Sequence, residues 1–279
     1  GWAARDNKEL ITREYVEKAI SKKNYRNNNY EEKLIEMIDK EFIFIDTEGR
    51  KIGEINGLSV IDSGQYLFGR PSKITVNTYG GKDGIINIER EVEQSGSIYD
   101  KGVMILTGYL GEKYAQNYPL SLTASITFEQ SYSGIDGDSA SSTELYALLS
   151  SLAEKPIKQS IADTGSVNQK GMIQPIGGVN EKIEGFYKIC KLKGLTGDEG
   201  VIIPFANIQN LMLNDEVINA VKAGKFKIYG VKTIDEGIEI LTGIKAGRLN
   251  EKGEYEKGSI NYLVQKKLDY YARISKEQE

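Results

Sequence analysis

The sequence has no histidine and a single cysteine, Cys190, among its 279 residues. Hydrolases that use a histidine base are therefore excluded, because their serine or cysteine nucleophile is activated by an imidazole. Zinc sites built on histidine or on several cysteines are excluded too, which leaves only rare all-carboxylate ligand sets. A lone cysteine cannot form a disulfide within the chain. This composition is typical of a reducing compartment, and we expect the cytoplasm.

Other familiar signals are also absent. No run approaches the roughly 20 apolar residues of a membrane span, and no signal peptide is visible. No basic stretch dominates a chain of net charge −4, so we expect neither a membrane nor a nucleic-acid partner. The glycine-rich places match neither G-x-x-x-x-G-K-[ST] nor a dinucleotide fingerprint, so they predict turns and no cofactor in this chain. The chain begins Gly1-Trp2 without a methionine, which we interpret as a fragment or a processed product.

Hydrophobic periodicity predicts a mixed α/β protein. Residues 1–40 have helical spacing, with Thr12 as an N-cap and a break at Asn27-Asn28-Asn29. Strand and helix patterns then succeed one another up to residue 243. The expected strands are 42–45, 51–61, 73–79, 85–88, 120–128, 161–167, 201–203 and 226–231. The expected helices are 100–118, one from about 139, one after 178 and a short one ending at 241.

Composition divides the chain into three parts. We expect a helical segment at 1–40 and a central α/β domain at 41–243. Residues 244–279 would be a linker rich in Gly, Lys and Glu followed by one terminal helix. A chain of this length can bury roughly three-quarters of its unfolded surface, so it needs no disulfide or metal to hold its core.

The segment Gly134-Ile-Asp-Gly-Asp-Ser-Ala-Ser141 lies between a predicted strand and a predicted helix. It places Asp136, Asp138 and Ser139 at a helix N-terminus, where free backbone N–H groups can stabilise an oxyanion. The part Gly137-Asp-Ser-Ala-Ser141 resembles a nucleophile elbow whose final glycine is replaced. The alternative interpretation is that Asp138 or Ser139 only caps the helix.

A serine without a histidine partner can be activated by a lysine. No lysine here has a serine three residues before it, so a Ser–Lys pair must form across the fold. We select Lys182, which follows Gly177-Gly178 in the first turns of a helix and flanks its apolar face beside Phe186. Burial disfavours the charged form of a lysine, so its pKa falls and it can act as a base. The alternative is an exposed lysine at a helix start.

These residues resemble the proteolytic domain of Lon proteases. The run Asp136-Gly-Asp-Ser-Ala140 is followed by Asp163-Thr-Gly-Ser166 and then by Pro175-Ile-Gly-Gly-Val-Asn-Glu-Lys182. The Gly-Asp-Ser-Ala-Ser form is similar to that of the B subfamily. The resemblance covers about 45–243 and implies the Lon proteolytic fold there. Residues 1–40 resemble the end of the AAA+ module that precedes this domain in Lon.

The resemblance implies a role for each matching residue. Ser139 would be the nucleophile, and Lys182 the general base and then the acid that protonates the leaving amine. Thr164 would orient Lys182, and the backbone N–H groups of Asp138 and Ser139 would form the oxyanion hole. Asp136 would contact the lysine and gate it. Contact of either aspartate with Lys182 would indicate a resting site, because a carboxylate favours the ammonium form.

The sequence also departs from the family pattern. Gly137 completes the serine motif, but Ser166 stands where the other subfamily tends to have an acid. Ser125 and Thr127 stand on the preceding strand where many Lon proteins have histidine. These differences affect the tuning of the site and leave both members of the serine–lysine dyad in place.

The absence of a nucleotide-binding loop implies that this chain is the C-terminal part of a longer ATP-dependent protease. ATP and Mg²⁺ would bind to the missing ATPase module, and no cofactor is expected here. The implied partners are unfolded protein substrates and identical subunits in a ring, usually a hexamer. The expected function is thus a serine endopeptidase. One alternative is a catalytically silent domain of the same fold that serves assembly. Another is a Ser–Lys amidase or peptidase of a different fold that acts on small substrates.

Overall fold

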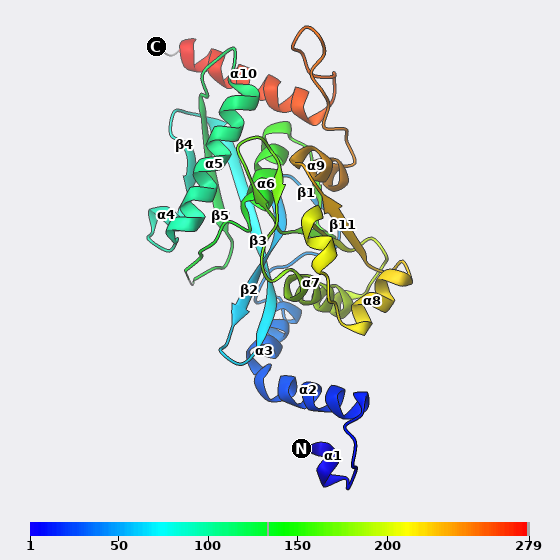
Figure 1. Cartoon of the computed structure of the whole chain (residues 1–279). Helices are drawn as coiled ribbons and strands as arrows, with labels where there is room; N and C mark the ends of the chain where they lie inside the picture. Colours follow the sequence, from blue (N-terminus) through cyan, green and yellow to red (C-terminus); the bar gives the residue numbers. More distant parts are fainter. Residues whose placement is uncertain (133, 278–279) are drawn as a thin grey trace.

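The computed structural model describes residues 1–132 and 134–277. Its centre is a seven-stranded mixed sheet in the order β11-β10-β7-β2-β3-β5-β4, with helices on both faces (Figure 1). The strands are β2 (Glu54–Asp62), β3 (Leu67–Gly80), β4 (Gly84–Asn87), β5 (Leu122–Phe128), β7 (Ile161–Asp163), β10 (Gly200–Pro204) and β11 (Lys227–Val231). The helices are α1 (Trp2–Arg5), α2 (Arg13–Asn27), α3 (Asn29–Asp39), α4 (Ile88–Glu91), α5 (Ser97–Tyr114), α6 (Ser141–Ala153), α7 (Val179–Lys193), α8 (Asp215–Lys222), α9 (Ile234–Thr242), α10 (Ile260–Glu277) and the 3-10 helix η1 (Phe205–Asn210). The expected mixed α/β class is confirmed.

The sheet has a parallel half and a largely antiparallel half. Strands β2, β7, β10 and β11 run parallel, whereas β2, β3 and β5 are antiparallel neighbours and β4 runs parallel to β5. Two small sheets accompany it, one of β1 (Arg50–Lys51) with β6 (Ile157–Lys158) and one of β8 (Ser166–Val167) with β9 (Ile173–Gln174). Ligands of open α/β sheets bind beyond the carboxyl ends of the parallel strands, so the residues after Asp163 are placed where a site is expected.

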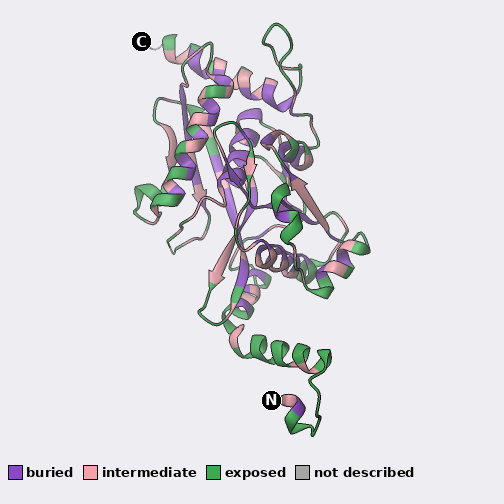
Figure 2. Cartoon of the chain, viewed as in Figure 1, coloured by how far each residue is buried: buried purple, intermediate pink, exposed green. Residues whose placement is uncertain are grey.

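The sheet separates two hydrophobic cores, seen as buried residues on both sides of it in Figure 2. The α6 core includes Ile74, Tyr99, Leu106, Leu145, Leu148, Ile202, Ile238 and Val264. The α7 core includes Leu34, Ile38, Phe68, Ile183, Phe186, Val201, Ile203 and Val217. Neighbours along β10 belong to different cores because successive strand residues point to opposite faces. Helices α6 and α7 are thereby packed against opposite sides of one sheet.

The terminal helices differ in how they pack. Helices α2 and α3 lie on either side of the expected break, and Asn28 separates them. Thr12 stands at the N-cap of α2, but its side chain makes no capping hydrogen bond, and α2 buries no residue. Helix α3 packs into the α7 core, and α10 packs into the α6 core through Val264 and Leu268. The division of the chain at residues 40 and 243 stays a prediction.

Two of the predicted strands are wrong. Residues 42–45 form no strand, because the N–H groups of Phe42 and Ile43 donate hydrogen bonds to Met37 O at the end of α3. The strand expected at 161–167 stops at Asp163, because Gly165 uses its backbone to pair with the residues around the start of α6. Helix α1 lies within the helical segment predicted at 1–40, whereas α4, α8 and the 3-10 helix were not expected. The other elements begin or end a few residues from their expected bounds. Within residues 1–132 and 134–277, no helix is long and apolar enough to cross a membrane.

Candidate active site

Ser139 lies in the turn that leads into α6, two residues before the helix begins. Gly137 has a φ of 93°, a conformation that favours glycine, and it bends the chain just before the serine. The Ser139 carbonyl oxygen accepts hydrogen bonds from Gly165 N at 2.9 Å and from Thr164 Oγ1 at 3.1 Å. The turn is therefore held at the carboxyl end of β7, and the half-buried Ser139 sits at the N-terminus of α6.

Lys182 reaches this serine from the other side of the sheet. Its Nζ lies 2.9 Å from Ser139 Oγ and 3.0 Å from Thr164 Oγ1. Close packing of α7 on β3 brings the lysine to the serine. A Cβ at Gly69 would lie 2.1 Å from Glu181 O and 2.8 Å from Lys182 Cα, so only glycine allows this approach. The structure thus brings together the serine, lysine and threonine that the sequence selected.

The lysine is enclosed by protein. Its exposed fraction is 3%, and burial lowers the pKa of Lys182 to about 8, while the carboxylates of Asp163 and Asp138 act in the opposite direction. The interpretation of Lys182 as an exposed lysine at a helix start is therefore wrong. A neutral amine becomes available much closer to neutral pH than for a lysine in water, as a base requires.

Thr164 fixes the direction of the hydrogen bonds around the lysine. A hydroxyl has one proton and two lone pairs, and Thr164 Oγ1 gives its proton to Ser139 O. It must therefore accept a hydrogen bond from Lys182 Nζ. In the neutral amine this leaves the nitrogen lone pair for the hydroxyl proton of Ser139.

The two aspartates of the serine motif are bound elsewhere. Asp136 is exposed, and its Oδ1 accepts from Gly137 N at 2.8 Å and from Tyr99 N at 3.3 Å. Asp138 Oδ2 accepts from Ser166 Oγ at 2.7 Å. Within the described residues neither carboxylate pairs with Lys182, so the gating contact expected for Asp136 is not present. Lys182 Nζ lies instead beside the hydroxyl groups of Ser139 and Thr164.

The backbone at the serine is free to bind an anion. The N–H groups of Asp138 and Ser139 have no acceptor in the part of the chain that the structure describes. They lie just before α6, where the aligned peptide dipoles place a partial positive charge. Donors of this kind stabilise the oxyanion of a tetrahedral intermediate, as the sequence predicts for these two groups.

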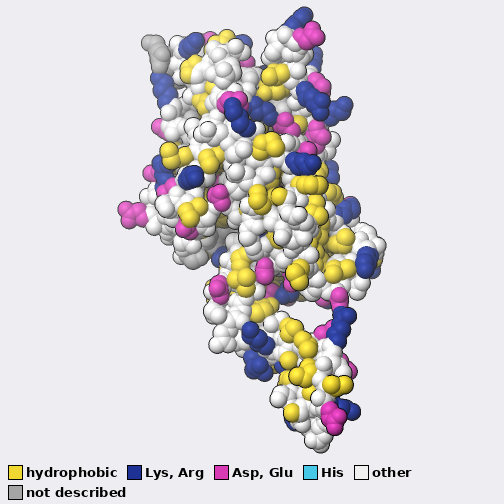
Figure 3. Space-filling model, in the orientation of Figure 1, with side chains coloured by type: hydrophobic (Ala, Val, Ile, Leu, Met, Phe, Trp, Pro, Cys, Tyr) yellow, Lys and Arg dark blue, Asp and Glu magenta, His cyan; other side chains and the backbone are white. Residues whose placement is uncertain are grey.

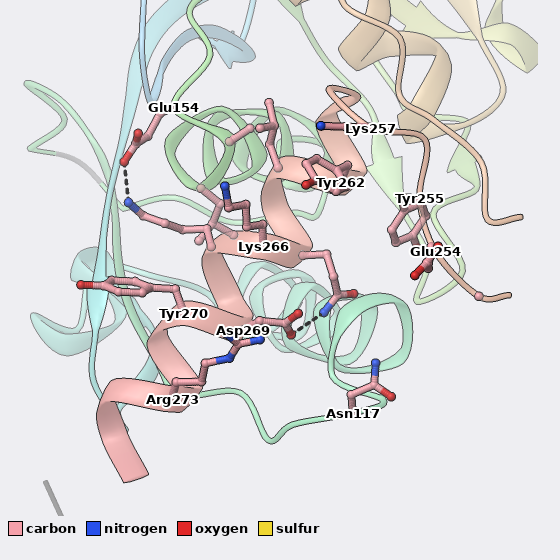
Figure 4. A pocket seen from close by; sticks show the side chains of 16 residues that line it. Asn117, Glu154, Glu254, Tyr255, Lys257, Tyr262, Lys266, Asp269, Tyr270 and Arg273 are labelled. Carbon is pink, nitrogen blue, oxygen red and sulfur yellow. Dashed lines mark hydrogen bonds and ion pairs between the residues drawn. The ribbon is translucent and has the colours of Figure 1, made fainter. Parts of the chain in front are cut away.

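A separate cleft lies against α10 (Figure 4). Its walls include Tyr262 and Lys266 of α10 and Glu154, which pairs with Lys267. None of the candidate site residues lines it, so it is distinct from the serine–lysine site.

Apolar side chains gather over η1 on the face shown in Figure 3. Phe205, Ile208 and Met212 of this region are exposed. Asn207 connects the region to the segment that enters α7, since its side chain accepts from Ile176 N at 3.0 Å and donates to Ile176 O at 2.9 Å. An exposed apolar surface is thus tied to the segment leading to the lysine helix.

Comparison with known proteins identifies the family. Residues 125–243 match the Lon protease (S16) C-terminal proteolytic domain. The chain is 42% identical over 253 residues to a "Putative Lon protease homolog" of Escherichia coli (strain K12), a match that covers 87% of this chain and 43% of that protein. The chain belongs to the Lon protease family. It is also 31% identical over 253 residues to the "Archaeal Lon protease" of Pyrococcus abyssi, covering 85% of this chain and 22% of that protein. The chain thus spans less than half the length of these Lon relatives.

The Lon match includes Ser139, Thr164 and Lys182. Sequence reasoning missed two features of this Lon site. Ser166, noted only as a departure from the family pattern, binds the carboxylate of Asp138. Asp163 is buried at the end of β7, and the signal for it was a lone acid that ends the otherwise apolar run Ile161-Ala-Asp.

Proposed function

We propose that this Lon-family domain is a serine endopeptidase that cleaves unfolded polypeptides through Ser139 and Lys182. The observation that carries the proposal is the 2.9 Å separation of Lys182 Nζ and Ser139 Oγ, with the lysine only 3% exposed. A buried amine beside a serine hydroxyl is the arrangement that activates serine without histidine.

The reaction follows from this geometry. Neutral Lys182 takes the proton of Ser139 while Oγ attacks the carbonyl carbon of the scissile peptide. The N–H groups of Asp138 and Ser139 bind the oxyanion of the tetrahedral intermediate. The ammonium of Lys182 then gives its proton to the leaving amine, and an acyl-enzyme forms. Lys182 next takes a proton from a water molecule, whose oxygen attacks the acyl carbon, and the ammonium of Lys182 returns that proton to Ser139 Oγ as the acyl group leaves.

The substrate class is supported by the surface near the site. Phe205, Ile208 and Met212 form an exposed apolar region, and exposed apolar patches mark places where other chains bind. An unfolded polypeptide offers both apolar side chains and an extended backbone, whereas a folded protein hides them.

Family membership supports the wider setting. We expect identical subunits arranged in a ring, usually a hexamer, and substrate unfolding by an ATPase module outside this chain that binds ATP and Mg²⁺. The lone buried Cys190 fits a reducing compartment, the cytoplasm. These points concern the whole protein, of which this chain covers a part.

The test is labelling of Ser139 with a fluorophosphonate together with cleavage of casein, which is unfolded and needs no ATPase. The wild type should do both, Ser139→Ala and Lys182→Gln should do neither, and the exposed control variants Ser21→Ala and Lys222→Gln should match the wild type. A wild type that is never labelled would support a silent assembly domain. Labelling with cleavage of small amides but not of casein would support a small-substrate amidase.

A further inference from the structure

Asp163 is a buried acid beside the serine–lysine site. It is the last residue of β7, immediately before Thr164, and its exposed fraction is 1%. In register it lies between Gly57 of β2 and Ile202 of β10. Neither neighbour has a polar side chain. The hydrogen-bond partners of the carboxyl group therefore come from outside the sheet.

Those partners belong to the first turn of α6. Asp163 Oδ2 lies 2.7 Å from Ser142 Oγ and 2.7 Å from Thr143 Oγ1. Ser142 Oγ is also 2.9 Å from Gly165 O, and Thr143 Oγ1 is 3.2 Å from Asp163 O. One carboxyl oxygen and two backbone carbonyls therefore compete for two hydroxyl protons.

This arrangement satisfies both protonation states of Asp163. When the carboxyl group is ionised, both hydroxyls donate to Oδ2. When it is protonated, its O–H donates to one hydroxyl, and the hydroxyls of Ser142 and Thr143 turn to Gly165 O and Asp163 O. No heavy atom has to move, so Asp163 can gain or lose a proton and still hold α6 to the end of β7.

The charge of Asp163 acts on the base of the dyad. The titratable groups that face it are Lys182 from α7 and Tyr146 from α6. Asp138 also acts on Lys182, but it is bound to Ser166. Burial raises the pKa of Asp163 to about 7, and its hydroxyl partners and Lys182 act in the opposite direction. Asp163 and Lys182 thus titrate in overlapping ranges of pH.

We infer that Asp163 is a positioning residue for this site: it ties the helix that follows Ser139 to the strand end that carries Thr164, and its charge governs when Lys182 can accept a proton. The inference rests on the proposed function, because it concerns the proton that Lys182 takes from Ser139. An ionised Asp163 stabilises the ammonium form, whereas a neutral Asp163 leaves the lysine free to lose its proton.

The variant Asp163→Asn removes the charge of the side chain and keeps its shape. The amide oxygen can still accept from Ser142 and Thr143, but the negative charge is gone. The ammonium of Lys182 then loses a stabilising partner, so its pKa falls. The acid limb of the pH profile for reaction at Ser139 should move to lower pH by about one unit, the lower end of the usual effect of a neighbouring opposite charge.

The measurement is the rate of fluorophosphonate labelling of Ser139 as a function of pH. We expect the Asp163→Asn limb at lower pH than the wild-type limb, and an unmoved limb for the control Asp215→Asn, whose side chain is 80% exposed. A limb that stays in place while the rate falls at every pH would overturn the inference and leave Asp163 a purely structural role. A wild type that is never labelled would overturn the proposed function instead.

If circular dichroism shows that Asp163→Asn does not fold, a second variant tests the role of Asp163. Ser142→Ala removes one donor to the carboxylate and keeps Asp163. The carboxyl group then stays neutral to higher pH, so the limb should again move to lower pH, by a smaller amount. An unmoved limb in Ser142→Ala would then overturn the inference.

Discussion

Ser166 Oγ donates a hydrogen bond to Asp138 Oδ2 at 2.7 Å and so keeps the carboxylate beside the nucleophile on a partner other than Lys182. Ser166 stands at the position where the other Lon subfamily tends to have an acid. With Asp138 held in this way, Lys182 has Ser139 and Thr164 as its hydrogen-bond partners. Ser166 thus contributes to the site by binding Asp138, a carboxylate that competes with Ser139 and Thr164 for Lys182.

Ser166→Ala should release Asp138 toward the lysine. A freed carboxylate favours the ammonium form, so the pKa of Lys182 rises and the acid limb of activity moves to higher pH. At neutral pH the rate of peptide cleavage should fall about tenfold for each pKa unit gained. The pH profile of kcat/KM measures this, with Ser21→Ala as the control. A limb displaced to lower pH would contradict the role given to Ser166.

Thr164→Val should impair the site without unfolding it. Valine keeps the shape but removes both the acceptor for Lys182 Nζ and the donor to Ser139 O. We expect kcat/KM to fall on the order of 100-fold, the low end of the contribution of a well-placed general base. Thr164→Ser retains the hydroxyl and should recover most of the activity. A loss in Thr164→Ser as large as that in Thr164→Val would contradict the role given to the hydroxyl, because serine retains it.

Gly69→Ala should separate α7 from β3. The added Cβ would meet Glu181 O at 2.1 Å and Lys182 Cα at 2.8 Å, and overpacking of this kind costs about 1–3 kcal/mol in the free energy of unfolding. Urea denaturation measures the loss, and fluorophosphonate labelling of Ser139 should slow because the lysine is displaced. Gly111→Ala is the matched control: nothing lies within 4 Å of its Cβ in helix α5, so stability should hold or rise by up to about 1 kcal/mol. Similar losses in both variants would contradict the proposed close packing.

Glu144 should make the protein less stable as pH rises. Burial raises the pKa of this α6 carboxyl group from its ordinary value of 4.5 to about 8. The folded state therefore keeps a proton that the unfolded state releases. The free energy of unfolding should fall between these two pH values, by up to about 1.4 kcal/mol per pH unit from this group. Glu144→Gln should flatten that decline in urea titrations at successive pH values. An unchanged slope would show that Glu144 is ionised in the fold.

The sequence was sufficient to select the residues that meet at the site. Ser139, Thr164 and Lys182 stand in three separate motifs, and the order and residue types of these motifs carried the prediction. The sequence could not predict that Asp136 turns away to Tyr99 N and Gly137 N. That choice depends on which donors the fold brings within reach, and Tyr99 comes from a distant helix.

The ends of the strands could not be predicted from the sequence either. The sequence predicts one strand from Ile161 to Val167, but Gly165 N donates to Ser139 O and Gly165 O accepts from Ser142 N. These tertiary bonds end the strand at Asp163. Likewise, the apolar run at residues 42–45 indicated a strand, although its backbone completes the end of α3. Local patterns give residue preferences, while the partner of each backbone group is decided by the whole fold.

The sheet that separates the two cores has a consequence for synthesis of the chain. Ser139 precedes a helix of the α6 core, and Lys182 belongs to a helix of the α7 core, so neither half alone assembles the pair. The α6 core is completed late, because Val264 and Leu268 of α10 belong to it. A chain still emerging from the ribosome therefore lacks the Ser139–Lys182 pair until α7 has been made and packed on the sheet.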